Sequence, residues 1–268
     1  MRWEELSKEM QDYISDELLK VTEALQNVED ILKDELELNL PRENVEIPEE
    51  IRIRLPKGYI RTVESIEDEY YLKQLIEDNT LRKNIAYAIQ YTDFLNYIFN
   101  RFSLGIDGLT VGKEFRKISI IYIMAIVEAL LAGIIEKFIT TCFKCQIYGN
   151  CTSKLAQCMK SHERNFRKVY EKNKYLSFSE SIEFIKETYV SKQEYVEKLE
   201  HFKKYYRNRI HIQYVDRSTG ERPWDYSEKY DVALYNEAVK LLQSTKEIIW
   251  ELDDKIQYEC TIKLFESL

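Results

Sequence analysis

Apolar residues recur every three or four positions along most of this chain, which is the spacing of amphipathic helices. The first such segment runs from Trp3 to Leu38. Its apolar face is formed by Leu6, Met10, Tyr13, Ile14, Leu18, Val21, Leu25, Val28 and Leu32. A second segment begins near Ser65, which forms a capping-box-like pair with Asp68, and continues to Ile98. The pattern therefore predicts two long helices in the first hundred residues.

The segments between these helices carry the turn-forming residues. Residues 41–61 alternate between apolar and polar side chains and are interrupted by Pro48 and Pro56, which predicts an extended arm with room for a short edge strand. The loop SLGIDGLTVG contains three of the seven glycines, Gly105, Gly108 and Gly112. We place a domain boundary at this loop, between an N-terminal helical region, 1–112, and a C-terminal bundle, 113–268.

The second half of the chain is also helical in pattern. An apolar helix is expected from Lys113 to Thr140, followed by a cysteine-bearing loop and a basic helix, ERNFRKVYEKNKY. Capping-box pairs, Ser177 with Glu180 and Ser191 with Glu194, predict two more helix starts. A last helix is expected over 228–265. With few glycines and prolines, the whole sequence predicts an all-α protein built from long helices, whose second half is a four- or five-helix bundle.

The segment from Ile118 to Ile135 is almost long and apolar enough to cross a membrane. Glu128 lies in its middle, where a carboxylate would be costly in lipid, so a core helix of a soluble bundle is the better interpretation. The start of the chain, MRWEELSKEM, lacks the pattern of a secretory signal, so we expect a cytoplasmic protein without a membrane partner. The net charge of −8 predicts that any nucleic-acid contact is local.

The candidate chemistry lies in YYRNRIHIQY, residues 205–214. On a helix, Arg207 and His211 would lie on the same face one turn apart, with Asn208 about 100° around the axis. A permanently charged guanidinium beside an imidazole that titrates near neutral pH suits the binding and protonation of a phosphodiester. The structural alternative is a histidine that complements a helix dipole and an arginine that covers apolar surface.

The order Arg207, Asn208, Arg209, Ile210, His211 resembles the signature of the HEPN superfamily of all-helical domains. The segment AIVEALL, with Glu128, is similar to an early bundle helix of that family, and the resemblance covers residues 113–268. It implies a homodimer that cleaves RNA without a metal or other cofactor. It also implies a role in stress or phage defence, of the toxin–antitoxin kind, which includes an inhibitory partner protein.

The resemblance assigns roles to individual residues. His211 would act as general acid or base, Arg207 would stabilise charge at phosphorus, and Asn208 would orient the phosphate or the motif. Glu128 would pair with Arg207, although another cation is an open alternative. Three cations would bind RNA: Lys203, Lys204 and Arg209.

Four cysteines fall in CFKCQIYGNCTSKLAQC, namely Cys142, Cys145, Cys151 and Cys158. Four thiolates could hold one structural zinc ion tetrahedrally, and His162 is close enough in sequence to replace one of them. Unliganded thiols and an iron–sulfur cluster are the alternatives, whereas a cytoplasmic location disfavours disulfides.

Two functions other than RNA cleavage remain open. The interval between Arg207 and His211 is shorter than in most HEPN proteins, which favours a non-catalytic module that binds a nucleotide, RNA or a partner protein. The long N-terminal helix favours a structural interaction protein, because its apolar face could dock on a partner. An exposed apolar stripe on that helix would support the latter.

Overall fold

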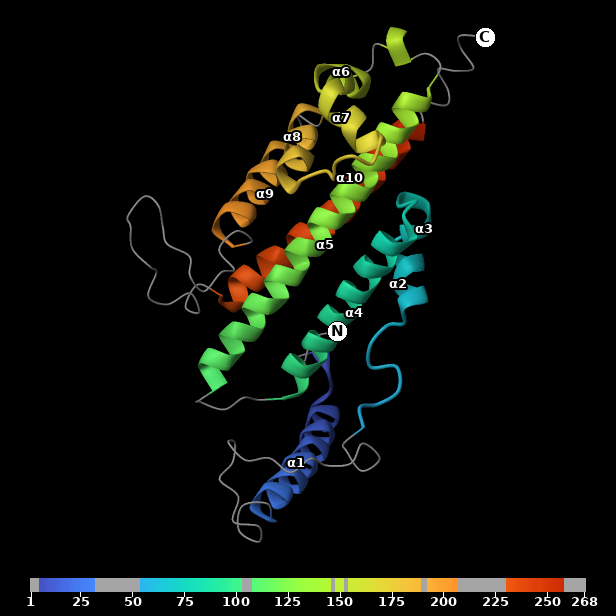
Figure 1. Cartoon of the computed structure of the whole chain (residues 1–268). Helices are drawn as coiled ribbons and strands as arrows, with labels where there is room; N and C mark the ends of the chain where they lie inside the picture. Colours follow the sequence, from blue (N-terminus) through green and yellow to red (C-terminus); the bar gives the residue numbers. More distant parts are fainter. Residues whose placement is uncertain are drawn as a thin grey trace, which may run out of the picture. The chain divides into compact units, whose positions relative to one another are not determined.

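The computed structural model describes residues 5–31, 54–102, 108–145, 148–151, 154–188, 192–206 and 230–257 (Figure 1). All regular structure within these ranges is helical, so the predicted all-α class is confirmed. The chain divides into two units after Pro56, not at the glycine-containing loop near residue 112. The predicted boundary is displaced because the helices on the two sides of that loop share one core.

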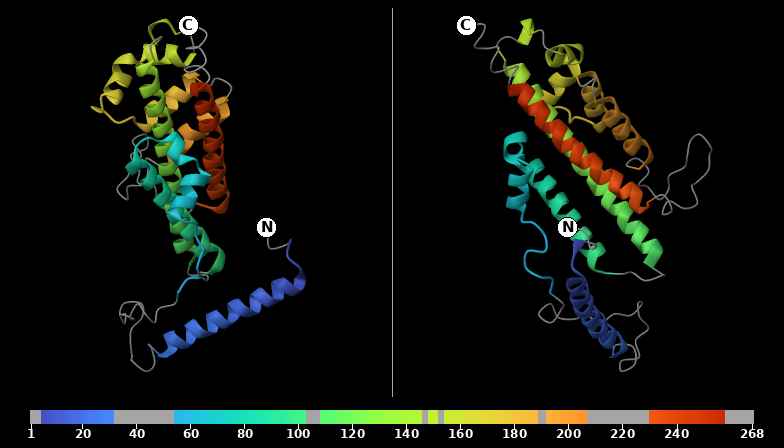
Figure 2. Two further views of the ribbon diagram at one scale, coloured as in Figure 1. Left: turned by 90° about the vertical axis from the view of Figure 1, so that its right-hand side faces the viewer. Right: turned by 180° about the vertical axis from the view of Figure 1, so that it is seen from behind.

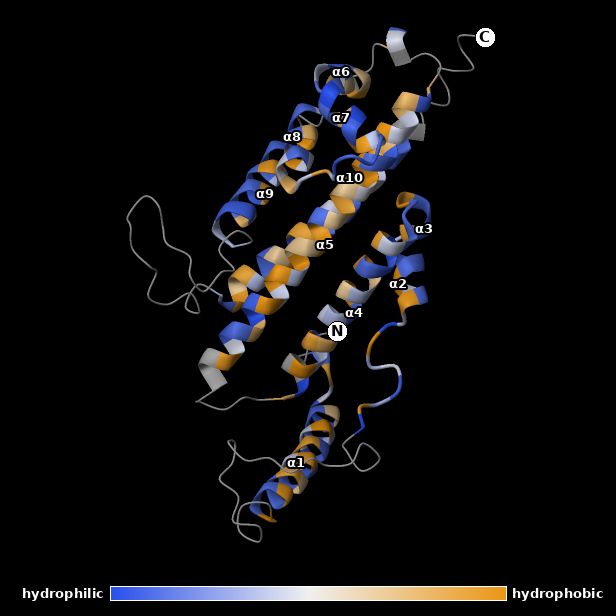
Figure 3. Ribbon diagram, in the orientation of Figure 1, coloured by the Kyte–Doolittle hydropathy of each residue, from blue (hydrophilic) through white to orange (hydrophobic). Residues whose placement is uncertain are grey.

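The first unit contains helix α1, Lys8–Asp30. Ser7 caps its N-terminus by accepting a hydrogen bond from the backbone N–H of Met10 at 3.2 Å. The predicted helix ran from Trp3 to Leu38, and both of its predicted ends lie outside the described residues, which leave out 1–4 and 32–53. Most of the predicted extended arm, 41–61, lies outside them too. No residue of α1 is buried, and its apolar side chains alternate with polar ones along the helix (Figure 3). The exposed ones include Met10, Tyr13, Leu18, Val21 and Val28.

The second predicted helix is divided into three: α2, Val63–Glu69, α3, Leu72–Leu75, and α4, Asn79–Arg101. Thr62, rather than Ser65, caps α2, and the side chain of Asp78 caps α4 by accepting from two backbone N–H groups. Tyr71 has a left-handed φ of 52°, and this change of backbone direction separates α2 from α3. Its ring packs on Trp250 at 4.3 Å, and this contact from the other end of the chain helps to offset the backbone cost.

Helix α5, Gly108–Lys144, is the centre of the second unit. Helix α4 packs along one side of it, and α10, Val232–Gln257, runs beside it in every view (Figures 1 and 2). This packing explains why α5 is apolar around most of its circumference. By length and composition α5 could cross a membrane, but most of its apolar stretch is buried in the protein, as in the core helix of a bundle. The predicted apolar helix is confirmed, with extensions at both ends.

Three shorter helices pack on another side of α5: α6, Lys154–Ser161, α7, Glu163–Tyr170, and α8, Phe178–Thr188. A fourth, α9, Gln193–Tyr205, packs on α8 and α10. A 3-10 turn, η4, spans Tyr148–Asn150. The described part of the second half therefore holds six α-helices, where four or five were predicted. The difference arises because the cysteine-bearing segment contributes a helix of its own, α6.

The capping box between Ser177 and Glu180 at the start of α8 is confirmed. Ser177 donates to the Glu180 carboxylate from its backbone N–H at 3.0 Å and from its hydroxyl at 2.7 Å, while Glu180 N–H donates to Ser177 Oγ at 3.3 Å. Burial raises the pKa of Glu180, but its hydrogen bonds with Lys174 and Ser177 outweigh burial and hold that pKa below its ordinary value. Ser191 of the other predicted box lies outside the described residues, and Glu194 pairs with Lys198.

We expect Ser177→Ala to lower the free energy of unfolding by about 1 kcal/mol, because the helix loses its cap. The pKa of Glu180 is lower in the folded protein than in the unfolded chain, so its ionised carboxylate stabilises the fold. This contribution to the free energy of unfolding is complete above the unfolded pKa of about 4.3 and is lost as the pH falls through the folded pKa. Glu180→Gln should therefore flatten the pH dependence of stability in that acidic window, as measured by urea denaturation. Glu197→Gln, on the exposed face of α9, is the matched control, and equal flattening in both variants would contradict the assignment.

Candidate functional site

The four residues of the candidate motif, Arg207, Asn208, Arg209 and His211, lie outside the described residues. Helix α9 ends at Tyr205, and the backbone N–H of Tyr206 donates to Phe202 O at 3.0 Å as its C-cap. The expectation that Arg207 and His211 share one helical face therefore stays a prediction. Of the two neighbouring cations expected to bind RNA, Lys204 is exposed, with its ammonium 4.8 Å from the Tyr205 ring centroid, and Lys203 is half-buried.

The residues that flank the motif segment are fixed to each other and to α5. The rings of Tyr206 and Tyr230 are 5.9 Å apart in an edge-on arrangement. Arg116 of α5 donates from Nε to Tyr230 O at 2.8 Å, and the ammonium of Lys117 lies 6.0 Å from the Tyr230 ring. The chain thus leaves and re-enters the described bundle at one place, beside two cations of α5.

Glu128, the carboxylate expected to pair with Arg207, is half-buried near the middle of α5. It lies twelve residues beyond Arg116, which corresponds to about 18 Å along the helix. Because Arg207 is outside the described residues, the predicted ion pair remains a prediction.

A second cluster of chemically active side chains joins α6, α7 and α8 at one end of the bundle (Figure 1). Cys158 is on α6, His162 stands immediately before α7, and Glu187 is near the end of α8. His162 Nε2 and Glu187 Oε1 are 2.8 Å apart, and the sulfur, nitrogen and oxygen of the three residues all lie within 4.8 Å of one another. Cys158 is 5% exposed, whereas the His162 and Glu187 side chains are 36% and 34% exposed.

This group differs from the four-cysteine set predicted for zinc. Within the described ranges it is the one set of three or more such ligand atoms that could share a metal ion. Of the four predicted zinc ligands only Cys158 belongs to this group, and no three of Cys142, Cys145, Cys151 and Cys158, all of which are described, have their sulfur atoms within 4.8 Å of one another. The four cysteines are not joined in disulfides. Cys158 and the substitute ligand His162 were predicted from the sequence, whereas Glu187 carries no local sequence signal and was not.

Burial and the hydrogen bonds among the three side chains determine the charge of this cluster. Burial, with the hydrogen bond to Glu187, raises the pKa of the Cys158 thiol well above its ordinary value. Burial also raises the pKa of Glu187, but the hydrogen bonds with His162 and Cys158 together outweigh it, so the net pKa is lowered. A protonated, buried thiol is a poor nucleophile, which disfavours cysteine-based catalysis here.

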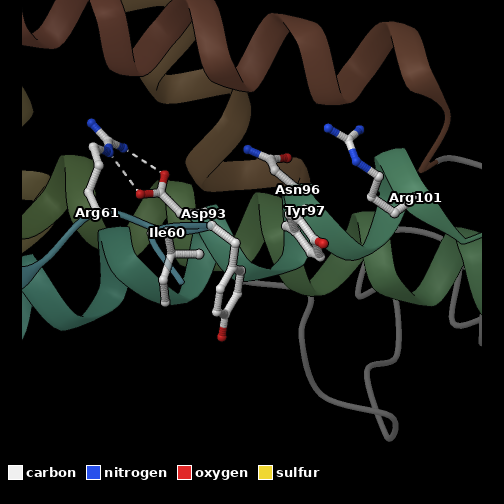
Figure 4. A pocket seen from close by; sticks show the side chains of 8 residues that line it. Ile60, Arg61, Asp93, Asn96, Tyr97 and Arg101 are labelled. Atoms are coloured by element: carbon white, nitrogen blue, oxygen red, sulfur yellow. Dashed lines mark hydrogen bonds and ion pairs between the residues drawn. The ribbon is translucent and has the colours of Figure 1, made fainter. Parts of the chain in front are cut away.

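A cavity of about 400 Å³ lies between the 58–61 segment and α4 (Figure 4). At one end, Arg61 donates to Asp93 from Nε at 2.8 Å and from Nη2 at 2.6 Å, and to Glu69 from Nη1 at 2.7 Å. Hydrogen bonding with Asp93 raises the pKa of Arg61 further above its ordinary value, against the opposing effect of burial. At the other end, the Arg101 guanidinium is 5.6 Å from the Tyr97 ring centroid.

The cavity residues lacked any motif in the sequence, because Arg61 and Asp93 are brought together only by the fold. Arg61 already contacts two carboxylates, so its charge is not available to attract an anionic ligand. Gln90 also donates to Arg61 O at 2.9 Å, which fixes the 58–62 segment to α4. We interpret this network as structural.

Comparison with known proteins gave no match: no family model, no curated protein and no solved structure is significantly similar to this chain. The resemblance to the HEPN superfamily therefore rests on the quoted residues alone.

Proposed function

We propose that this protein is a metal-independent endoribonuclease of the HEPN type that acts as a cytoplasmic homodimer. The observation that carries the proposal is the anchoring of the motif segment: its flanking residues, Tyr206 and Tyr230, meet beside Arg116 and Lys117 of α5. The two ends of the motif segment therefore lie close together in the bundle, and catalysis depends strongly on how side chains are positioned. The helical architecture is also consistent with this class.

In the proposed reaction the RNA 2′-hydroxyl attacks the adjacent phosphorus and the 5′-oxygen leaves. His211 accepts the 2′ proton or donates a proton to the leaving oxygen, with water making the other proton transfer, and Arg207 stabilises the additional charge on the phosphoryl oxygens. Asn208 orients the phosphate or the motif. The products carry a 2′,3′-cyclic phosphate, or the 3′-phosphate derived from it, and a 5′-hydroxyl.

Other residues and partners complete the proposal. Lys203, Lys204 and Arg209 bind neighbouring phosphates, and Glu128 pairs with Arg207. The two copies of a dimer place their motifs across one cleft. We also propose that the protein acts in stress or phage defence, as toxin–antitoxin proteins do, and that a partner protein inhibits it.

The direct test compares the purified wild-type protein with His211→Ala on a mixture of RNAs in EDTA. We expect cleavage by the wild type and a loss of at least about 100-fold in the variant, the lower range for a lost general acid or base. His201→Phe, which removes the imidazole of α9 but keeps an aromatic ring beside Tyr205 and Tyr206, is the matched histidine control and should retain activity. Equally intact RNA with wild type and His211→Ala would refute the nuclease proposal.

A measurement of binding to the same RNAs, made beside the cleavage assay, addresses the alternative functions. RNA or nucleotide binding without cleavage would favour a non-catalytic module, which the short interval between Arg207 and His211 supports. An interaction protein is favoured by a different observation, the exposed apolar side chains of α1, such as Tyr13 and Val21. On that interpretation the apolar face of α1 docks on a partner protein.

A further inference from the structure

We propose that Cys158, His162 and Glu187 form a binding site for one divalent transition-metal ion, with zinc as the best-fitting ion. The three residues offer one sulfur, one nitrogen and one oxygen within 4.8 Å of one another. This inference is independent of the proposed nuclease activity, which uses no metal.

The spacing of the three ligand atoms is close to what zinc requires. In a tetrahedral site with bonds of about 2.0–2.3 Å, ligand atoms lie roughly 3.3–3.7 Å apart. His162 Nε2 and Glu187 Oε1 are 2.8 Å apart, so a small outward rotation of these two side chains would admit an ion. The site therefore needs side-chain adjustment and no movement of helices.

The backbone holds the ligands in place. His162 N–H donates to Cys158 O at 3.1 Å, so His162 lies one turn after Cys158 at the end of α6, and its own non-helical φ of −110° and ψ of 19° then start α7. The His162 ring also packs on Phe166, with centroids 5.7 Å apart, which restricts its orientation. Glu187 approaches from α8, which packs against α6.

The donor types select the kind of ion. Magnesium and calcium prefer oxygen ligands, whereas a thiolate and an imidazole favour zinc and similar transition metals. One thiolate and one carboxylate balance a charge of +2, so binding leaves no net charge in a place where Cys158 is buried. His162 and Glu187 are one-third exposed, which gives the ion a path from solvent and leaves a fourth position for water.

The ion would act chiefly as a structural link. It would join α6, α7 and α8, three short helices whose burial against one another is limited by their length. Since the ligands must be deprotonated, affinity should increase with pH as the thiol loses its proton to the solvent.

The test is zinc binding by the full-length protein, measured by competition with a chromophoric chelator. We expect one equivalent to bind, and Cys158→Ser, His162→Ala and Glu187→Gln each to weaken binding by at least about tenfold, since even residues behind the ligands can have that effect. Cys145→Ser and His201→Ala are matched controls outside the group and should bind as the wild type does. Cobalt in place of zinc should give a thiolate charge-transfer band that Cys158→Ser abolishes.

A stability measurement guards against variants that fold poorly. Zinc at a hundredfold excess over its dissociation constant should raise the melting temperature of the wild type by about 5–10 °C. Glu187→Gln, which is nearly isosteric, should keep the helical circular-dichroism spectrum but show this shift reduced by about half or more at the same zinc concentration. The proposal is overturned if the wild type binds no stoichiometric zinc, if Glu187→Gln binds as tightly, or if Cys145→Ser loses affinity as strongly as Cys158→Ser, which would indicate the four-cysteine site instead.

Discussion

Replacing Phe138 with alanine should lower the free energy of unfolding by about 3–5 kcal/mol. Phe138 is 1% exposed on α5, and its ring centroid lies 5.4 Å from that of Phe184 on α8. Phe184 in turn contacts Phe166 of α7, so removal of one ring leaves a cavity where three helices meet. The helices are held by other contacts and can close that cavity only in part, which adds to the lost hydrophobic transfer. Urea denaturation followed by circular dichroism would measure the change.

A matched aromatic control is Tyr175, which is 90% exposed in the turn before α8. Tyr175→Ala should change stability by no more than about 0.5 kcal/mol. Phe138→Leu should fall between the two, because it keeps much of the buried volume. If Phe138→Ala and Tyr175→Ala cost the same, the cluster of three rings is not a centre of the core.

The features that sequence analysis recovered are those determined by neighbours along the chain. Helical spacing identified the all-α class and the apolar α5, and the pair Ser177 and Glu180 marked the start of α8 because both of its partners lie within one turn. The same reasoning from neighbouring residues was wrong between residues 65 and 78, where it predicted one continuous helix and the structure has breaks between α2, α3 and α4. There, the left-handed Tyr71 is accompanied by a ring contact with Trp250, a partner that no local pattern reveals.

The candidate site shows the same division. Cys158 and His162 are four residues apart, and their relation could be inferred from the sequence, whereas Glu187 reaches them only through the packing of α8 on α6. The Arg61–Asp93 pair was missed for the same reason. The four-cysteine set was grouped by proximity in the sequence, but in the structure no three of these thiols lie close enough to share one ion, and Cys158 is grouped instead with His162 and Glu187.

Replacing Lys137 with methionine should lower the free energy of unfolding by about 3 kcal/mol or more, the range for breaking a buried ion pair. Lys137 Nζ of α5 donates to Asp253 Oδ1 of α10 at 2.6 Å and to Gln74 O at the end of α3 at 2.8 Å. The two charged side chains are only 19% and 12% exposed. Methionine matches the length of the lysine stem, so the loss reports the cation that balances the Asp253 carboxylate rather than packing.

A double-mutant cycle distinguishes the interaction between Lys137 and Asp253 from the contributions that each side chain makes alone. Lys137→Met with Asp253→Leu should recover most of the lost stability, because two apolar side chains of similar size can replace a buried pair at little net cost. Lys73→Met is the exposed control: its pair with Asp68 has side chains 52% and 68% exposed, and its loss should stay below about 1 kcal/mol. A double variant no more stable than Lys137→Met would contradict the assignment of the loss to an unbalanced Asp253 carboxylate. Recovery would instead show that the charge balance between α5 and α10 is what the lysine supplies.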